Sequence, residues 1–225
     1  MDDHSLYQKN ACSVICRNCG KEYEAAAYSF IRADLDPNLK EQVIDGSLFS
    51  AECPYCGSKM MLNYETVYLD EESGIMIACM PARDRFELSS VYFELHGQNP
   101  ALLSRITENI NDLREKVMIF EAGLDDRTVE LAKAVLRSTL KEKGYGSEAL
   151  YFIKMFNHSL LFCTPYEGRN TFRMSISLDE AERIAVHAGL DEIDDEGEYV
   201  IDRRWAQTVL ESMDEDAQKP SGPVS

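Results

Sequence analysis

Cys16-Arg17-Asn18-Cys19-Gly20 and Cys53-Pro54-Tyr55-Cys56-Gly57 share one pattern, Cys-x-x-Cys-Gly, and no other motif in this sequence is as specific. Two intervening residues let both sulfur atoms of a pair point to the same side of a tight turn. The glycine after the second cysteine permits a positive φ angle, so that main-chain N–H groups can be directed at the sulfurs. Four thiolates in two such pairs are the ligands that a tetrahedral metal ion requires. The pattern therefore predicts one metal site with four ligands: Cys16, Cys19, Cys53 and Cys56.

The composition indicates a globular protein of one large or two modest domains. The chain has 225 residues, of which 44% are hydrophobic, enough to bury a sizeable core. Acidic residues outnumber basic ones by 40 to 23, which gives a net charge of -17. A protein that binds the phosphate backbone of a nucleic acid needs a basic surface to displace counterions, and no run of Lys or Arg is visible. The charge balance therefore argues against a nucleic-acid partner.

The sequence carries no signal for export or for membrane insertion. Residues 1–4 have neither the basic nor the apolar region of a signal peptide, and no stretch reaches the roughly 18 apolar residues of a membrane span. Seven cysteines would suggest disulfides in a short secreted protein. In a longer chain without an export signal, paired cysteines indicate metal ligation in a reducing compartment. We expect a cytoplasmic protein with no membrane-spanning segment.

The first 80 residues predict a zinc-ribbon-like β unit with one helix inserted between the two cysteine pairs. Residues 22–32 carry the aromatic and aliphatic side chains of a strand or hairpin arm. Asp36-Pro37 predicts the start of a short helix, because aspartate can cap it and proline fits its first turn, and Gly46 predicts its end. Strands over residues 60–69 and 75–80 should flank a turn at residues 70–74.

The middle of the chain has helical spacing. Leu113, Val117 and Phe120 recur on one helical face, and Gly123 ends this run. A second helix should begin at Asp125 or Asp126 and end at Gly144. Because the connecting turn is short, we expect the two helices to pack as an antiparallel hairpin.

Beyond residue 146 the pattern predicts a compact β-β-β-α-α module. Two apolar stretches, residues 149–156 and 159–164, flank Asn157-His158 and predict a β-hairpin, with a third strand over residues 171–176. Residues 177–180, Ser-Leu-Asp-Glu, have the form of a capping box that opens a helix, and Asp202 should cap a last helix. The fold class is therefore α+β, divided into a metal-binding domain (1–100), a helical hairpin connector (101–145), the C-terminal module (146–213) and a disordered tail (214–225).

Several segments together resemble a known family, the bacterial CpXC domain. They are Cys16–Lys21, Asp36–Lys40, Leu48-Phe49, Cys53–Gly57 and Tyr68–Asp70, with residues 111–120 and 123–131 similar to the segment that follows this domain. The similarity covers roughly residues 12 to 135 and is looser beyond about 145. Arg17 stands where the family motif has proline, which should not affect ligation. The resemblance implies a four-cysteine zinc site in a bacterial cytosolic protein, and it implies no activity.

The identity of the metal is open from the residue types, since zinc and iron both form tetrahedral thiolate sites. Cys53-Pro54-Tyr55-Cys56-Gly57 is also similar to the motif of rubredoxins, which hold one iron for electron transfer. Rubredoxins are much smaller and enclose their iron in clustered aromatic residues, so the long helical insert and the CpXC resemblance favour zinc. Four protein ligands leave no position for water on zinc, and such a site is structural rather than catalytic.

The remaining cysteines and histidines give no second site. Cys12 could compete as a ligand but is better explained as an ordinary cysteine beside the site, and Cys79 and Cys163 fit core packing. His158 is too close to Cys163 along a hairpin to be a persuasive catalytic partner. His96, expected in a turn, and His187, expected on a helix, lie at no metal spacing, and the acidic residues 191–198 have no calcium-loop pattern.

Motifs of the common enzyme classes are absent: no Walker A, Gly-x-Gly-x-x-Gly, nucleophile elbow or His-Glu-x-x-His occurs. We therefore expect a zinc-stabilised, cytoplasmic, non-enzymatic protein that interacts with another protein. Three alternatives belong to other classes: a nucleic-acid-binding zinc ribbon, a rubredoxin-like iron electron carrier, and an enzyme whose catalytic residues are scattered along the chain.

Overall fold

The computed structural model describes residues 7–144, 149–164, 173–193 and 197–218, and within them it contains six α-helices and three β-sheets. The expected α+β class is confirmed. The chain divides into two compact units, residues 1–117 and residues 118–225, called here the N-terminal and the C-terminal unit. The domain boundaries expected at residues 100, 145 and 213 remain predictions. In the described part of the chain, no helix combines the length and the apolar character needed to cross a bilayer.

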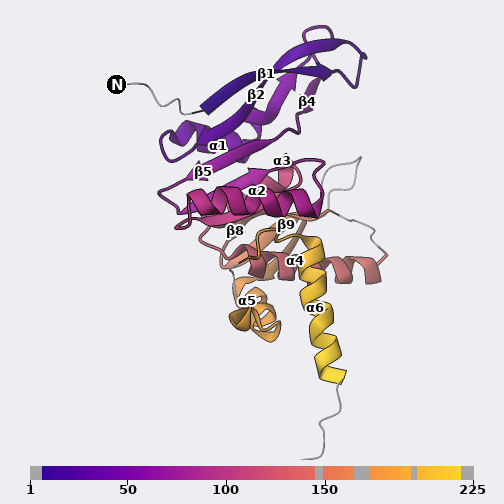
Figure 1. Cartoon of the computed structure of the whole chain (residues 1–225). Coiled ribbons are helices and arrows are strands. Elements are labelled where there is room, and N and C mark those ends of the chain that lie inside the picture. Colours follow the sequence, from indigo (N-terminus) through magenta and orange to yellow (C-terminus); the bar gives the residue numbers. More distant parts are fainter. Residues whose placement is uncertain (1–6, 145–148, 165–172, 194–196, 219–225) are drawn as a thin grey trace, which may run out of the picture. The chain divides into compact units, whose positions relative to one another are not determined.

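The N-terminal unit is built on a mixed sheet of five strands in the order β1-β2-β5-β6-β7 (Figure 1). Antiparallel pairs β1-β2 and β5-β6 alternate with parallel pairs β2-β5 and β6-β7. A separate two-stranded antiparallel sheet consists of β3 and β4. The strands of this unit are β1 Tyr7–Ile15, β2 Glu22–Arg32, β3 Ser50–Glu52, β4 Lys59–Met61, β5 Thr66–Asp70, β6 Ile75–Cys79 and β7 Leu103–Thr107.

Helix α1, Pro37–Asp45, begins and ends where its sequence predicts. The Asp36 side chain accepts a hydrogen bond from the Asn38 N–H, and Gly46 ends the helix with φ +84°. Leu39 and Val43 form its buried side. A short 3-10 turn, η1 (Ser47–Phe49), then leads directly into β3.

Residues 60–69 do not form the single strand expected from their sequence. They are divided between β4 and β5, which belong to different sheets. Residues 62–65 between them are fixed by long-range contacts: the Leu62 N–H donates to the Phe49 carbonyl, and the Asn63 side chain accepts from the Ile110 N–H. These partners are distant in sequence, so the break has no local signature. The turn at residues 70–74 agrees with the expectation, with Gly74 at φ +71°.

Helix α2, Arg85–Gln98, and strand β7, which packs against it, were not expected from the sequence. The signal for the helix was present, because Asp84 and Glu87 form a reciprocal capping box at its start. His96 lies in the last turn of α2, where its ring stacks on Tyr92 at 5.2 Å, and not in the turn expected for it. The helix connects β6 to the parallel strand β7, as a parallel crossover requires.

The C-terminal unit contains a three-stranded antiparallel sheet, in the order β10-β9-β8, and three helices. Its elements are α4 Asp126–Glu142, β8 Tyr151–Phe156, β9 Ser159–Cys163, β10 Arg173–Ser177, α5 Leu178–His187, η2 Leu190–Glu192 and α6 Arg203–Gln218. Helix α3, Ile110–Glu121, spans the boundary between the two units, so the antiparallel packing expected of α3 and α4 remains a prediction. Gly123 follows α3 with φ +69° and Asp125 caps α4, as the sequence indicates.

One face of this sheet packs on α4. The shared core includes Val129 and Leu136 of α4 with Leu160, and the rings of Phe152 and Phe162 meet edge to face at 6.0 Å. Asn157 and His158 both have positive φ angles, +47° and +57°, as the two-residue turn of a hairpin requires. The expected strand at residues 171–176 is seen from residue 173 onward, and residues 171–172 lie outside the described range.

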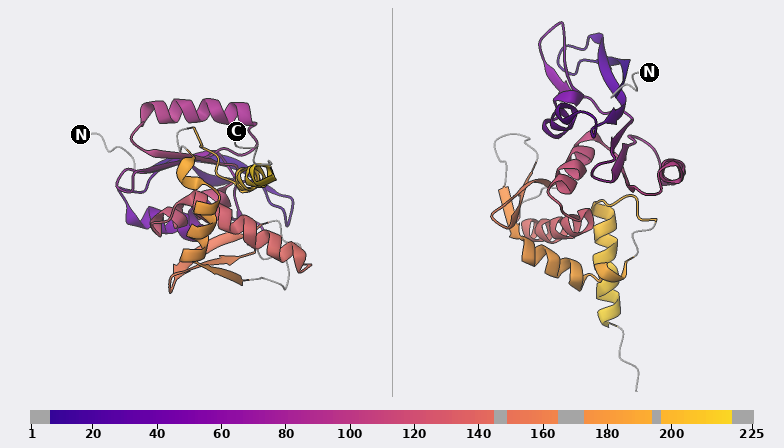
Figure 2. Two further views of the ribbon diagram at one scale, coloured as in Figure 1. Left: turned by 90° about the horizontal axis from the view of Figure 1, so that it is seen from below. Right: turned by 90° about the vertical axis from the view of Figure 1, so that its left-hand side faces the viewer.

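Helices α5 and α6 both pack on α4 (Figure 2). Their contact is an apolar cluster in which Leu131 of α4 meets Ala185, Ile201 and Trp205. Ser177 caps α5 by accepting from the Glu180 N–H, as the sequence indicates. Helix α6 continues to Gln218 and thus includes the first residues of the expected tail, while residues 219–225 lie outside the described range.

Candidate metal centre

The two Cys-x-x-Cys-Gly motifs form turns with the same backbone hydrogen bonds. The first turn joins β1 to β2, and the second joins β3 to β4. In the first turn, the Cys16 N–H donates to the Lys21 carbonyl at 2.9 Å and the Gly20 N–H donates to the Cys16 carbonyl at 2.8 Å. The second turn repeats both bonds at 2.9 Å, from Cys53 to Ser58 and from Gly57 to Cys53. The two glycines have φ angles of +71° and +70°, the conformation expected from the sequence.

The four sulfur atoms of these turns lie within 4.8 Å of one another. The Sγ atoms of Cys16 and Cys56 are 3.6 Å apart, and those of Cys19 and Cys53 are 3.7 Å apart. Zinc–sulfur bonds of about 2.3 Å at tetrahedral angles place neighbouring sulfurs about 3.8 Å apart. The donor set and its spacing therefore fit one tetrahedral metal ion, which these four side chains could hold.

One side of the sulfur group is enclosed by the β unit and the other is open. Cys16 and Cys53 are each 1% exposed and pack with Tyr23 of β2, while Cys19 and Cys56 are more exposed to solvent. A cation–π contact also joins the two turns, because the Lys21 ammonium lies 4.6 Å from the centre of the Tyr55 ring. An ion bound here would be shielded by protein on one side only.

Hydrogen bonds to sulfur favour the thiolate form of two cysteines. The Asn18 amide donates to the Cys56 sulfur at 3.6 Å and, with the Ser58 N–H, lowers the pKa of Cys56 to about 6. The Cys19 N–H donates to the Cys16 sulfur and lowers its pKa as well. Thiolates are the metal-binding form of cysteine. These N–H donors therefore favour the form of Cys16 and Cys56 that can bind a metal ion.

The pKa of Cys19 is shifted in the opposite direction. The Lys21 N–H donates to its sulfur and by itself would lower the pKa, but lost hydration and the neighbouring sulfurs raise it to about 11. Without a cation, four sulfurs this close cannot all carry a negative charge. The positive charge of a bound metal ion would offset the repulsion among the four thiolates.

The other three cysteines are outside the sulfur group. Cys12 lies on β1 opposite Ala25 and is not among the clustered residues. Cys79 is fully buried in β6, and burial raises the pKa of its thiol to about 12, as suits a core cysteine. Cys163 ends β9, whereas His158 precedes that strand and lies 2.9 Å from an Asp179 oxygen. The imidazole of His158 is therefore engaged with Asp179 of α5.

Asn18 and Tyr23 are the neighbours of the site that sequence reasoning did not identify. Asn18 lies within the first motif, but its amide serves a cysteine of the second motif 38 residues later. Tyr23 follows the first motif by three residues and packs on one cysteine of each pair. No local pattern distinguishes these roles from those of an exposed turn residue and an ordinary strand aromatic.

Comparison with known proteins agrees with this site. No curated protein and no solved structure matches the chain. The family model described as CpXC protein matches residues 14–133, which is more than half of the chain and includes all four clustered cysteines. The extent agrees with the resemblance noted in the sequence. This chain belongs to the CpXC family.

Proposed function

We propose that this chain is a zinc-stabilised cytoplasmic protein whose function is to bind another protein, and that it is not an enzyme. The observation that carries the structural role of the metal is the closed donor set: four protein sulfurs at tetrahedral spacing. A zinc ion with four protein ligands has no position for water or substrate, so it would hold the two turns together rather than take part in a reaction.

Zinc is favoured over iron by the size of the inserted segment. Between the two motifs lie strand β2, helix α1, η1 and strand β3, so the chain is organised differently from a small electron carrier. The aromatic neighbour at the sulfurs is Tyr23, and Tyr55 of the second motif points to the Lys21 ammonium.

The preference for a protein partner rests on an apolar helix face in the N-terminal unit. Phe86 and Phe93 of α2 are 80% and 68% exposed, and their spacing of seven residues places both rings on one side of the helix. Large apolar side chains exposed together are typical of a surface that another protein covers. Glu87 and Glu94 follow them on the helix, which makes the surface unsuitable for a phosphate backbone.

Metal analysis of the full-length protein, purified without added metal, tests the metal assignment. We expect one zinc ion per chain, loss of the ion in the variant Cys53→Ser, and retention in the matched control Cys12→Ser, because Cys12 is outside the sulfur group. A coloured protein with stoichiometric iron would instead support the electron-carrier alternative.

Affinity capture with the full-length protein tests the partner assignment. The variant Phe86→Ser/Phe93→Ser should lose a specific protein partner that wild type retains. Leu35→Ser is the control, since Leu35 is also exposed, at 50%, but lies outside α2. Capture of nucleic acid in place of protein, or equal capture by all three proteins, would contradict this assignment.

A further inference from the structure

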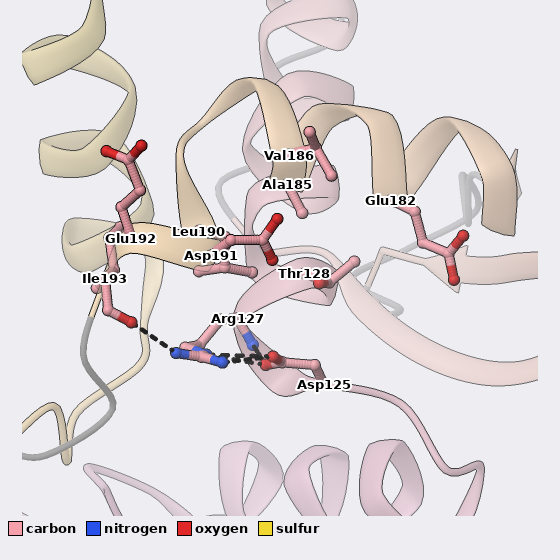
Figure 3. A pocket seen from close by; sticks show the side chains of 10 residues that line it. All are labelled: Asp125, Arg127, Thr128, Glu182, Ala185, Val186, Leu190, Asp191, Glu192 and Ile193. Atoms are coloured by element: carbon pink, nitrogen blue, oxygen red, sulfur yellow. Dashed lines mark hydrogen bonds and ion pairs between the residues drawn. The ribbon is translucent and has the colours of Figure 1, made fainter.

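Helix α5 of the C-terminal unit has a hollow on each of its two sides. The first hollow, about 830 Å³ in volume, lies between the start of α4 and the turn from α5 into η2 (Figure 3). The second, about 880 Å³, lies among α4, α5 and α6. Glu182 and Val186 of α5 line both hollows. The exposed side of α5 and the two hollows thus form one continuous surface, called here the α5 surface.

The second hollow is mainly apolar. Val135 of α4, Ile184 and Val186 of α5 and Leu210 of α6 line it. Val186 is 63% exposed, unusual for a valine in a helix that already buries Ala181 and Ala185 on its other side. A partner that covered these aliphatic groups would gain free energy from removing them from water.

Three carboxylates beside this apolar patch have no counter-charge among the residues that the structure describes. In the first hollow, the Arg127 guanidinium is already held by Asp125 at 2.8 Å and by the Ile193 carbonyl (Figure 3). The carboxylates of Glu182, Asp191 and Glu192 make no ion pair or hydrogen bond with any described residue. In Figure 3 those of Asp191 and Glu182 lie on opposite sides of Ala185 and Val186.

Arg183 and His187 line the second hollow together with Asp179 and Glu180, and the guanidinium of Arg183 is neutralised. Arg183 pairs with Glu180 on the same helix. Asp179, at the start of α5, lies 2.9 Å from His158. The charge left unmatched over the α5 surface is therefore negative, and it adjoins an aliphatic patch.

We propose that the α5 surface docks a segment of another protein that carries lysine or arginine beside an aliphatic residue. The cations would pair with Glu182 and Asp191, and the aliphatic side chain would cover Val186 and enter the second hollow. A two-fold contact between α5 surfaces of two copies would oppose the same unmatched carboxylates, and a nucleic acid would bring further negative charge. This inference rests on the proposed protein-binding function and names the chemistry of one partner.

Site-specific photo-cross-linking tests the proposal. A benzophenone amino acid replaces Val186 in the full-length protein, which is irradiated in extract of the cells that produce it, and the cross-linked peptide is sequenced by mass spectrometry. We expect a segment with lysine or arginine next to an aliphatic residue. The charge reversal Glu182→Lys in the same protein should reduce the yield by about tenfold, because it opposes the partner's cation.

Glu142→Lys is the matched control. It makes the same change of charge on an exposed residue at the end of α4, about 20 Å along the helix from Thr128 of the first hollow and about 10 Å from Val135 of the second. The cross-link should survive it. Far-ultraviolet circular dichroism on each variant checks that the helices are intact.

The other possible outcomes contradict the inference, and they show whether the proposed function fails with it. A cross-linked segment without basic residues, a second copy of this chain, or a yield unchanged by Glu182→Lys would overturn it and leave the proposed function standing. The same holds if Val186 gives no product while the benzophenone at Phe86 captures a protein. Absence of any protein product at both positions would overturn the inference and the proposed function together.

Discussion

At the end of helix α1, the side chain of Arg114, which is distant in sequence, determines which residue can occupy position 46. Arg114 of α3 donates to the last carbonyls of α1, from Nε to Val43 at 3.1 Å and from Nη2 to Ile44 at 2.8 Å. The Val43 carbonyl also accepts from the Gly46 N–H at 3.2 Å, and Arg114 supplies further donors at this helix end, where the last carbonyls lack i+4 partners. A Cβ atom at Gly46 would lie only 2.8 Å from Cζ of Arg114. Glycine is therefore needed at this position for its positive φ and also for the space that the guanidinium occupies.

Gly46→Ala should lower the free energy of unfolding by roughly 2–3 kcal/mol, part from the left-handed conformation and part from displaced hydrogen bonds. Gly74→Ala is the control, because Gly74 has φ +71° and no atom within 4 Å of a Cβ, so it should cost only about 1 kcal/mol. Urea denaturation measures both. Equal losses would show that the Arg114 contact contributes nothing.

The Asp70 carboxylate makes stability depend on pH in the acid range. Asp70 is fully buried; burial alone would raise its pKa, but the Lys40 ammonium at 2.7 Å and two hydrogen bonds from Ser73 hold the pKa below its ordinary value. A lowered folded-state pKa contributes stability above the unfolded-state pKa and loses it as the pH falls toward the folded value.

Comparison with Asp70→Asn isolates this contribution. Wild type should be the more stable protein at neutral pH, and its advantage should shrink as the pH falls below about 4, the ordinary aspartate value. Any cysteine-bound metal would be released alike from both proteins in acid, so the difference in unfolding free energy between them reports Asp70. A difference that stays constant down to about pH 2 would contradict this account.

At the scale of elements, the second cysteine turn connects two strands that have little other support, whereas the first joins β1 and β2 of the five-stranded sheet. Strands β3 and β4 have three residues each and, within the described part of the chain, form a sheet of their own. So short a hairpin has little stability of its own unless a cross-link such as a metal site holds it together. Bound zinc contributes something on the order of 10 kcal/mol to comparable small sites.

Treatment with a strong chelator should therefore abolish hydrogen-exchange protection in β3, β4 and the adjoining part of β1 and β2. Strands β5 and β6 should keep theirs, because β6 is buried on both faces of the sheet. Hydrogen exchange with mass spectrometry compares the same peptides with and without chelator. Unchanged protection at β3 and β4 would show that the metal is dispensable for this hairpin.

Elements with local signals were predictable from the sequence. Helices α1 and α5 were found from their caps, and the β8–β9 hairpin from its two turn residues. The break between β4 and β5 was not, because hydrogen bonds to Phe49 and Ile110 impose it from elsewhere in the chain. Helix α2 was overlooked although its capping box was visible, since its apolar residues lie on opposite sides and blur the helical period.

At the scale of the whole molecule, all four clustered cysteines belong to the N-terminal unit. The C-terminal unit has its own apolar clusters around Phe162 and Trp205. Chelation should therefore leave hydrogen-exchange protection in α4 and β9 within about twofold of its starting value, since these elements do not depend on the sulfur group. Loss of protection there would show that the two units unfold as one.

Local sequence was sufficient to group four cysteines from two separate turns and to locate most helices and strands. Ligand spacing, capping residues and turn glycines act within a few residues, so they can be read without knowing the fold. The arrangement in space was needed for everything that joins distant segments: the β1–β2 arm within a five-stranded sheet, Asn18 against Cys56, Arg114 at the end of α1, and the hollows beside α5. Strand partners and surface hollows follow from which buried faces fit together, and this depends on packing across the chain rather than on any single stretch of it.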